Sequence, residues 1–548
     1  MADVSGSPVV DTPASMEEKP VDDAPQDSNK DEGKAEGENE ESLDPEMYRY
    51  IKEDLFTSEI YKVEIQESPQ VHRLQRPEEV PGQTRPQPAQ NQAVRQAERS
   101  PSSPSRTRGA RQGHEDGARH AGGRASVQIA NVVTPLWNVP YEEQLKRKEQ
   151  EVVGVLQRLA KEIGSTNKAL LPWLFAQKGK YNRMCCSLEA IRPSPVQTEY
   201  RNKCEFLISM GADGVDKTIG FRMGKYKGGS CAVVGPGETT HVSAEAKRVV
   251  SAFQKFISPE TYEGHWKQLT VRTTRTKQAM AMAFFNPQKL DEEEVGALKN
   301  SMKTYFTEGE GKDSGVTSLY FIREGQRTSP TLEGLPCELV SGEGSIHEEM
   351  LGLKFRISPH SFFQVNTSAA EVLYSAVGEW AQLSEDSTVL DVCCGTGTIG
   401  ISLAKRVKKV IGIEMCQEAV EDAKVNAKLN GLSNIEFHCG KAEDVFPNIL
   451  NALVSPNLTA IVDPPRAGLH SKVILAIRRA EHLKRLVYVA CNAKAAMNNF
   501  IDLCRAPSKR VHGAAFRPVR AMAVDLFPQT MHLEMLLLLE RVDYDSKQ

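Results

Sequence analysis

The last third of the 548-residue chain alternates short strands with helical stretches. Each predicted strand is rich in apolar and β-branched residues, and the helical stretches lie between them. This order of elements is typical of a doubly wound α/β sheet, in which helical crossovers join parallel strands. Ligands of such sheets bind beyond the carboxyl ends of the strands, so residues at those ends are the first candidates for a functional site. The predicted strands are 389–394, 409–414, 434–440, 459–463 and 485–491.

A glycine-rich turn follows the first of these strands and opens a helix. Its glycines, Gly395 and Gly397, stand where a Cβ would block a ligand lying close to the backbone. Glu414 ends the next strand about 20 residues after the turn begins, where an acid can accept hydrogen bonds from both hydroxyls of a ribose. The pattern therefore predicts a cofactor that carries a nucleoside.

The residue before the glycines favours one such cofactor. Asp391 is an acid, and an acid there suits the amino-acid and ribose portions of S-adenosylmethionine, which has no pyrophosphate. A nicotinamide dinucleotide and a tight turn without any ligand are the two alternatives. We expect S-adenosylmethionine.

A double proline follows the fourth predicted strand, in the sequence Asp463-Pro464-Pro465-Arg466. Methyltransferases that act on amino groups usually carry an aromatic residue after such a pair, which stacks on a flipped base. Arg466 in that place argues against an exocyclic nitrogen as the methyl acceptor. Its guanidinium is instead suited to a base edge or a phosphate.

Cys491 ends the fifth predicted strand. A lone cysteine in such a place is more often a small core residue, but this one shares its edge with the glycine turn and the double proline. Carbon 5 of uracil is a poor nucleophile toward a sulfonium methyl group. A thiolate that adds to carbon 6 produces an enolate whose carbon 5 can attack. The proton on carbon 5 must then leave, and Glu534, in an apolar stretch, is the candidate base.

Composition divides the chain into four expected segments. Basic residues such as Arg201 and Lys203 in the third segment are suited to a phosphate backbone, although a solvated sheet face would explain them nearly as well. The segments are a disordered tail, first acidic and then basic (1–129), a helical lead-in on the catalytic domain (130–197), a β-rich RNA-contacting domain (198–358) and a Rossmann-like methyltransferase domain (359–548).

Cysteine spacing and hydropathy exclude several classes of protein. The 11 cysteines include no C-x-x-C pair, so we expect neither structural zinc nor an iron–sulfur cluster. No apolar run approaches the roughly 20 residues that span a bilayer, and no secretory or mitochondrial signal is visible at the N-terminus. We expect a cytoplasmic or nuclear protein, or one found in both. The sequence does not indicate an oligomeric state.

Five motifs, in order, resemble the RNA uracil-5-methyltransferase family, and most closely the nuclear and cytosolic tRNA enzymes of animals. They are FFQVN (362–366), DVCCGTG (391–397), DPPR (463–466), ACN (490–492) and FPQTMHLE (527–534). The resemblance covers about 130–542. It implies that Gln364, Cys393, Thr398, Glu414 and Asp463 contact S-adenosylmethionine. It also implies that Cys491 is the nucleophile, that Glu534 accepts the proton, and that the substrate is a uridine in the T-loop of tRNA.

Two departures from the family refine this expectation. Bacterial ribosomal-RNA relatives carry iron–sulfur cysteines before the helix that begins here near Tyr141, and this chain has none there, which favours tRNA. The animal tRNA enzymes begin an RNA-recognition domain at a strand that residues 61–66 retain. The tract that follows lacks the alternating strands and aromatic residues of a stacking sheet. We therefore expect no intact RNA-recognition domain, a pattern that altered splicing or an altered reading frame would produce.

Two other functions fit the same motifs. Cytosine-5 methyltransferases present their thiol after a proline, whereas Cys491 follows Ala490. An RNA-binding or tRNA-folding protein with an idle methyltransferase domain is the second alternative.

Overall fold

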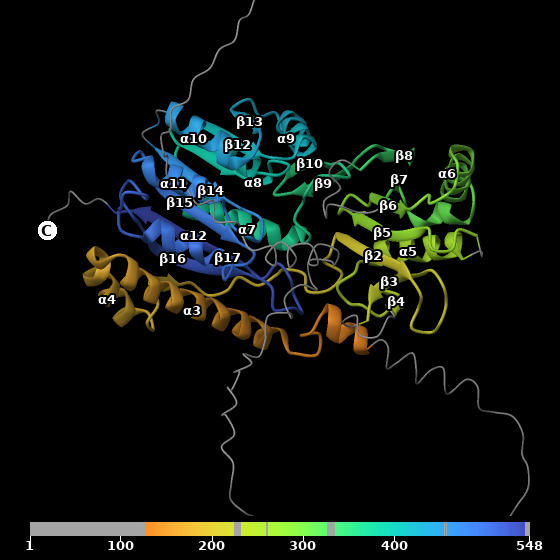
Figure 1. Cartoon of the computed structure of the whole chain (residues 1–548), viewed down its shortest axis with the longest axis horizontal. Helices are drawn as coiled ribbons and strands as arrows, with labels where there is room; N and C mark the ends of the chain where they lie inside the picture. Colours follow the sequence, from red (N-terminus) through yellow and green to blue (C-terminus); the bar gives the residue numbers. More distant parts are fainter. Residues whose placement is uncertain are drawn as a thin grey trace, which may run out of the picture. The chain divides into compact units, whose positions relative to one another are not determined.

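The computed structural model describes residues 127–223, 232–258, 261–325, 335–453, 455 and 457–542. Nearly all of the predicted tail, including the strand expected at 61–66, lies outside these residues. The described residues build two large sheets and a set of helices (Figure 1).

The first sheet has eight strands in the order β1-β16-β17-β15-β14-β11-β12-β13. The five predicted strands are all present, and they pair in parallel with one another. β17 runs antiparallel to both of its neighbours. The strands are β1 (Ser187–Leu188), β11 (Thr388–Val392), β12 (Lys409–Glu414), β13 (Ile435–Cys439), β14 (Leu458–Val462), β15 (Leu483–Ala490), β16 (Phe516–Val524) and β17 (Glu534–Arg541).

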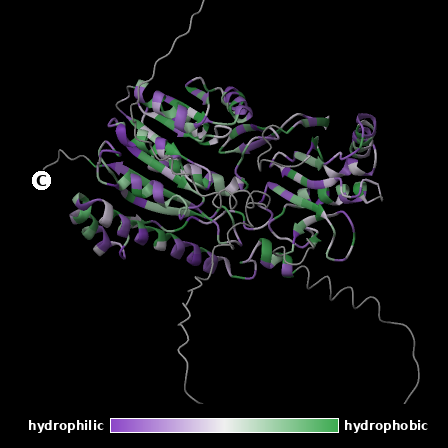
Figure 2. Ribbon diagram, in the orientation of Figure 1, coloured by the Kyte–Doolittle hydropathy of each residue, from purple (hydrophilic) through white to green (hydrophobic). Residues whose placement is uncertain are grey.

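Helices cover both faces of this sheet. Successive side chains of one strand belong to two different hydrophobic clusters, one on each face. Val389 packs in one hydrophobic cluster with residues of α7, α8 and α9, whereas Leu390 packs in a second with residues of α3, α10, α11 and α12. The strands are accordingly hydrophobic in Figure 2. The helices are α7 (Thr367–Trp380), α8 (Thr398–Leu403), α9 (Gln417–Leu429), α10 (Ala442–Ala452), α11 (Ser471–Arg479) and α12 (Met497–Cys504). The predicted Rossmann-like α/β fold is confirmed.

The second sheet has seven strands in the order β4-β3-β2-β5-β6-β7-β8 and is mostly antiparallel. It confirms a β-rich region between the lead-in and the Rossmann-like fold, and it packs against two helices that the sequence analysis did not predict, α5 (Ala244–Ile257) and α6 (Glu292–Thr307). A hairpin of β9 (Ile346–Met350) and β10 (Leu353–Ile357) follows. The strands are β2 (Lys203–Ser209), β3 (Thr218–Arg222), β4 (Val233–Val234), β5 (Trp266–Thr273), β6 (Ala279–Phe285), β7 (Ser318–Arg323) and β8 (Cys337–Gly342).

Helix α3 (Tyr141–Thr166) lies in the predicted helical lead-in, begins where a helix is expected near Tyr141, and leads into α4 (Leu171–Lys180). Its buried side chains recur every three or four residues, as expected for one face of a helix. Two of them, Gln144 and Lys148, are polar. The sequence pattern, which counts apolar residues, gives no reason for burying them.

In the part of the chain that the structure covers, helices are too short or too polar to cross a membrane. Within the same residues, no group of three or more histidine, cysteine, aspartate or glutamate side chains is arranged to hold a metal ion.

Candidate active site

The candidate site lies at the carboxyl edge of the eight-stranded sheet. β12, β11, β14 and β15 are consecutive there, so the residues at their ends share one rim. β17 runs in the opposite direction, so it begins at the rim where β15 ends. The rim residues are Cys393, Glu414, Asp463, Cys491 and Glu534.

The glycine turn after β11 leaves room beside its backbone. A Cβ at Gly395 would have only one neighbour within 4 Å, the Phe362 carbonyl oxygen at 3.9 Å. Gly397 is different: its φ is +79°, and a Cβ there would come within 2.9 Å of the Phe437 ring. Open space at one glycine and close packing at the next fit a turn that receives a ligand on one side. With Gly400, the turn has the G-x-G-x-x-G spacing that dinucleotides also use.

Glu414 is oriented by the turn and by its own strand end. One carboxylate oxygen accepts from the Gly395 N–H (3.0 Å), and the other accepts from the N–H groups of Met415 (2.8 Å) and Cys416 (3.0 Å). The side chain is only partly buried. A carboxylate has about four lone-pair sites, so this one retains capacity for hydroxyl donors of a ligand.

Asp391 lies beneath the turn and is fully buried. Its Oδ2 accepts from the Gly400 N–H at 2.8 Å, whereas Oδ1 has no hydrogen-bond partner among the described residues. Burial raises the pKa of this carboxyl to about 7. The unsatisfied oxygen and the open side of Gly395 fit a ligand that brings hydrogen-bond donors, as an amino acid or a ribose does.

Tyr374 was missed by the sequence analysis. Its hydroxyl lies 3.1 Å from the Thr398 Oγ1, and its side chain is buried. Burial raises the pKa of Tyr374, and the charges of Asp463, Asp391 and Glu534 raise it further. The three carboxylates therefore gather around one phenol. A tyrosine eight residues after FFQVN, on a helix, gives no sequence signal of this role.

Asp463 follows β14, and its N–H donates to the Val392 carbonyl oxygen at 3.2 Å. Burial and the nearby Asp391 raise the pKa of the Asp463 carboxyl. The residues after Asp463 then form a small pocket with the end of β15. Its lining includes Pro464, Pro465, Arg466, Cys491 and Asn492. The double proline and the cysteine are thus brought together as the sequence predicted.

Glu534 is the first residue of β17 and is 3% exposed. Ala490 pairs with Met535 in the antiparallel ladder. Cys491 follows β15 directly and Glu534 precedes Met535 on β17, so both residues lie next to this last pair of the ladder, at the same edge of the sheet.

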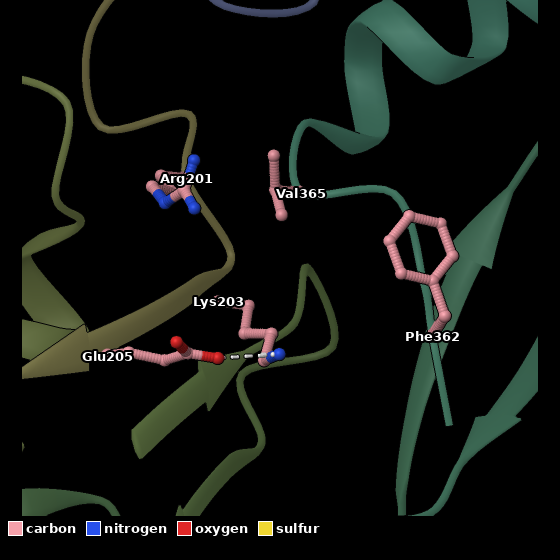
Figure 3. A pocket seen from close by; sticks show the side chains of 5 residues that line it. All are labelled: Arg201, Lys203, Glu205, Phe362 and Val365. Carbon is pink, nitrogen blue, oxygen red and sulfur yellow. Dashed lines mark ion pairs between the residues drawn. The ribbon is translucent and has the colours of Figure 1, made fainter. Parts of the chain in front are cut away.

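A second pocket lies beside the second sheet (Figure 3). Arg201 and Lys203 line it from the start of β2, together with Glu205, and Phe362 and Val365 line it from the segment before α7. Lys203 forms an ion pair with Glu205 (2.8 Å) and lowers the pKa of that carboxyl to about 2. Arg201 is only 6% exposed, whereas Phe362 is 52% exposed.

Gln364 belongs to the FFQVN segment and precedes Val365, which lines this pocket. Its side chain is buried, and its main-chain carbonyl oxygen accepts a hydrogen bond from the Asn202 Nδ2 at 2.9 Å. Asn202 also donates its N–H to the Val365 carbonyl oxygen (2.8 Å). The YRNKCEF and FFQVN motifs, which are far apart in the sequence, are therefore held together by hydrogen bonds.

Comparisons with known proteins show which family this chain resembles. A family model described as tRNA (Uracil-5-)-methyltransferase matches residues 343–542. The chain is 56% identical over 537 residues to the tRNA (uracil-5-)-methyltransferase homolog A of Homo sapiens, which covers 92% of this chain and 86% of that protein. It is 41% identical over 426 residues to the human homolog B, which covers 76% of this chain and 84% of that protein.

A solved structure shares the fold. The Pyrococcus abyssi tRNA (uracil-54, C5)-methyltransferase, in complex with S-adenosyl-L-homocysteine, aligns with a TM-score of 0.53 and 23% identity. The alignment covers 75% of this chain and 86% of the archaeal chain. At this level of identity, the likeness supports the architecture.

We predict that Asp391→Asn stabilises the protein at high pH. The pKa of Asp391 is raised in the folded state, so the native protein holds more protons than the unfolded chain between about pH 4 and pH 7. Stability therefore falls as the pH rises through that window. In urea unfolding without added ligand, Asp391→Asn should raise the free energy of unfolding relative to wild type, and this increase should be about 1–3 kcal/mol larger at pH 8 than at pH 5. Asp386→Asn, at an exposed position, is the control. An equal gain at both pH values would contradict the prediction.

Proposed function

Because the chain belongs to the tRNA (uracil-5-)-methyltransferase family, we propose that it methylates carbon 5 of a T-loop uridine in tRNA through a covalent adduct with Cys491. The observation that carries this proposal is the register of β15 and β17, which pairs Ala490 with Met535 and so brings the adjacent residues Cys491 and Glu534 to the same edge of the sheet. A nucleophile and a base are the two groups that the reaction requires of the protein.

The chemistry divides into an addition and an elimination. The Cys491 thiolate forms a bond to carbon 6 of the uracil, and the electron pair of the 5,6 double bond moves onto the ring as an enolate. Carbon 5 then gains the methyl group, whose bond to the sulfonium sulfur would break and leave S-adenosylhomocysteine as the by-product. Glu534 takes the proton from carbon 5, the double bond re-forms, and the sulfur–carbon 6 bond breaks to return the thiolate. Each half of this sequence depends on one side chain at the rim.

S-adenosylmethionine supplies an electrophilic methyl group on a sulfonium. Glu414 would accept hydrogen bonds from its ribose hydroxyls, and Asp391, Asp463 and Gln364 would supply further polar contacts. The open side of Gly395, the partly exposed Glu414 and the unsatisfied oxygen of Asp391 support this assignment. The archaeal structure of the same fold is a complex with S-adenosyl-L-homocysteine. The turn residues assigned to the cofactor are Cys393, Gly395, Gly397 and Thr398.

The target uridine is stacked within an RNA loop, so it must turn out of the loop to reach Cys491. Arg466 shares a pocket with Cys491 and is suited to hold the base edge or its phosphate. Lys203 would contact the RNA backbone, and the exposed ring of Phe362 in the same pocket is suited to stack on a base. The sequence also predicts that Arg201 contacts RNA, but its side chain is only 6% exposed, so its charge would act on the phosphates from within the pocket wall. In this proposal residues 198–358 contact RNA and residues 359–548 carry out the chemistry. Because tRNA is made in the nucleus and used in the cytoplasm, either location suits the substrate.

Cys491→Ala should abolish methyl transfer and leave tRNA binding intact, because the residue supplies the nucleophile of the proposed reaction. We expect turnover of labelled methyl groups into tRNA to fall about 10³-fold or more, with the dissociation constant for tRNA within about twofold. Cys337→Ala, in β8 of the other sheet, is the matched control and should turn over normally. Normal turnover by Cys491→Ala would contradict the mechanism and favour a different methyl acceptor.

Glu534→Gln should trap the reaction after methyl transfer. The amide cannot take the carbon 5 proton, so the sulfur–carbon bond persists and enzyme and RNA remain linked. A denaturing gel should show a shifted band that grows with time, while release of methylated tRNA slows. Glu540→Gln, near the other end of β17 and bonded to Arg485, is the control. If the shifted band is absent for Glu534→Gln, another residue is the base.

A further inference from the structure

Helix α3 carries a buried cation that its amphipathic pattern does not explain. The side chains of Lys148 and Asp525 are both 0% exposed. The Lys148 Nζ donates to the Asp525 Oδ1 and to the Phe527 carbonyl oxygen, the latter at 3.0 Å. Removing two charges from water costs several kcal/mol per ion, and well-packed apolar residues are often as stable. A buried pair of this kind is therefore better explained by the geometry that it specifies than by stability.

Two more residues on the same face of α3 bind the same segment. The Tyr141 hydroxyl donates to the Asp525 Oδ2 (2.9 Å) and accepts from the Ser194 N–H (2.8 Å). The Gln144 Oε1 accepts from the N–H of Gln529 (2.7 Å). Positions 141, 144 and 148 are three and four residues apart, so they lie along one stripe of the helix. Together the three side chains make four hydrogen bonds to residues 525–529, two of them from Lys148.

The conformation that these contacts hold is unfavourable by itself. Gln529 has a φ of +67°, in a region that residues with a side chain rarely occupy unless their surroundings impose it. Both of its backbone groups are fixed from outside the sheet: the N–H by Gln144, and the carbonyl oxygen by the Leu136 N–H (2.8 Å). Its side chain accepts a hydrogen bond from the Thr240 hydroxyl. The segment thus has one path, fixed by its neighbours.

This segment leads to the proposed base. Residues 525–529 form the first part of the connection from β16 to β17, residues 530–533 complete it, and Glu534 is the first residue of β17. A base must lie within hydrogen-bond reach of the proton that it abstracts, and a displacement of about 1 Å can cost about 100-fold in rate. The path of residues 525–529 therefore affects where the Glu534 carboxylate sits relative to the uracil ring.

We infer that Tyr141, Gln144 and Lys148 of helix α3 are positioning residues for proton abstraction, acting on Glu534 through the segment 525–529. The inference rests on the proposed function. It assigns to a helix outside the Rossmann-like sheet a role in the elimination half of the reaction. Formation of the sulfur–carbon bond requires Cys491, which follows β15 and lies outside the segment 525–529.

The test compares two variants with wild type. Lys148→Met/Asp525→Leu replaces the ion pair with apolar side chains, and Tyr141→Phe removes one hydroxyl and little else. We expect the double variant to lower kcat about 10- to 100-fold and Tyr141→Phe to lower it about 3- to 10-fold. KM for tRNA should stay within about twofold in both. Covalent enzyme–RNA adduct should accumulate on a denaturing gel, since addition continues while elimination slows.

Arg147→Met is the matched control, because Arg147 lies on the same helix and pairs with Glu143 with both side chains 45% exposed. It should behave as wild type. Wild-type kcat in a folded variant would overturn the inference, as would a loss of kcat without extra adduct, which indicates a structural role alone. If the double variant does not fold, the same two outcomes for Tyr141→Phe decide the question. If wild-type protein forms no 5-methyluridine, the proposed function fails instead.

Discussion

The site depends on one strand that runs against its neighbours. β17 lies between β15 and β16 and is antiparallel to both. In an all-parallel sheet, the first residue of a strand lies at the edge opposite the ligand site. The reversal brings Glu534, the first residue of β17, to the rim where β15 ends and Cys491 follows. The proposed nucleophile and the proposed base, more than forty residues apart in the sequence, thus lie at the same edge of the sheet.

Burial of charge is the second physical feature of this rim. Asp391 is fully buried. Burial raises the pKa of the Asp463 carboxyl, and the charge of the nearby Asp391 raises it further. The Tyr374 phenol lies among these carboxylates and Glu534. Collecting acids in a desolvated place opposes folding as they ionise. A ligand that brings hydroxyl and ammonium donors would relieve this cost, which gives a physical reason for such a ligand to bind at the glycine turn.

Local sequence patterns predicted the strands, the glycine turn and the residues at strand ends, because period and turn chemistry are short-range properties. They did not predict what depends on distant pairing. The place of β17 is set by a register between strands that no local pattern encodes, and the burial of Lys148 by an acid nearly 380 residues away. Arg201 is another case that local patterns did not predict: the sequence shows its charge, but it does not show that the side chain is buried. Helices α5 and α6 were missed because a strand-rich interpretation was applied to their whole region.

The most direct measurement is the identity of the methylated nucleoside. Unmodified tRNA is incubated with the protein and S-adenosylmethionine that carries an isotopic label on its methyl group, and the digested nucleosides are analysed by mass spectrometry. The account predicts one labelled product, uridine methylated at carbon 5. Label on cytidine, on an exocyclic nitrogen or on ribose would contradict it, and so would unlabelled tRNA that the protein nevertheless binds.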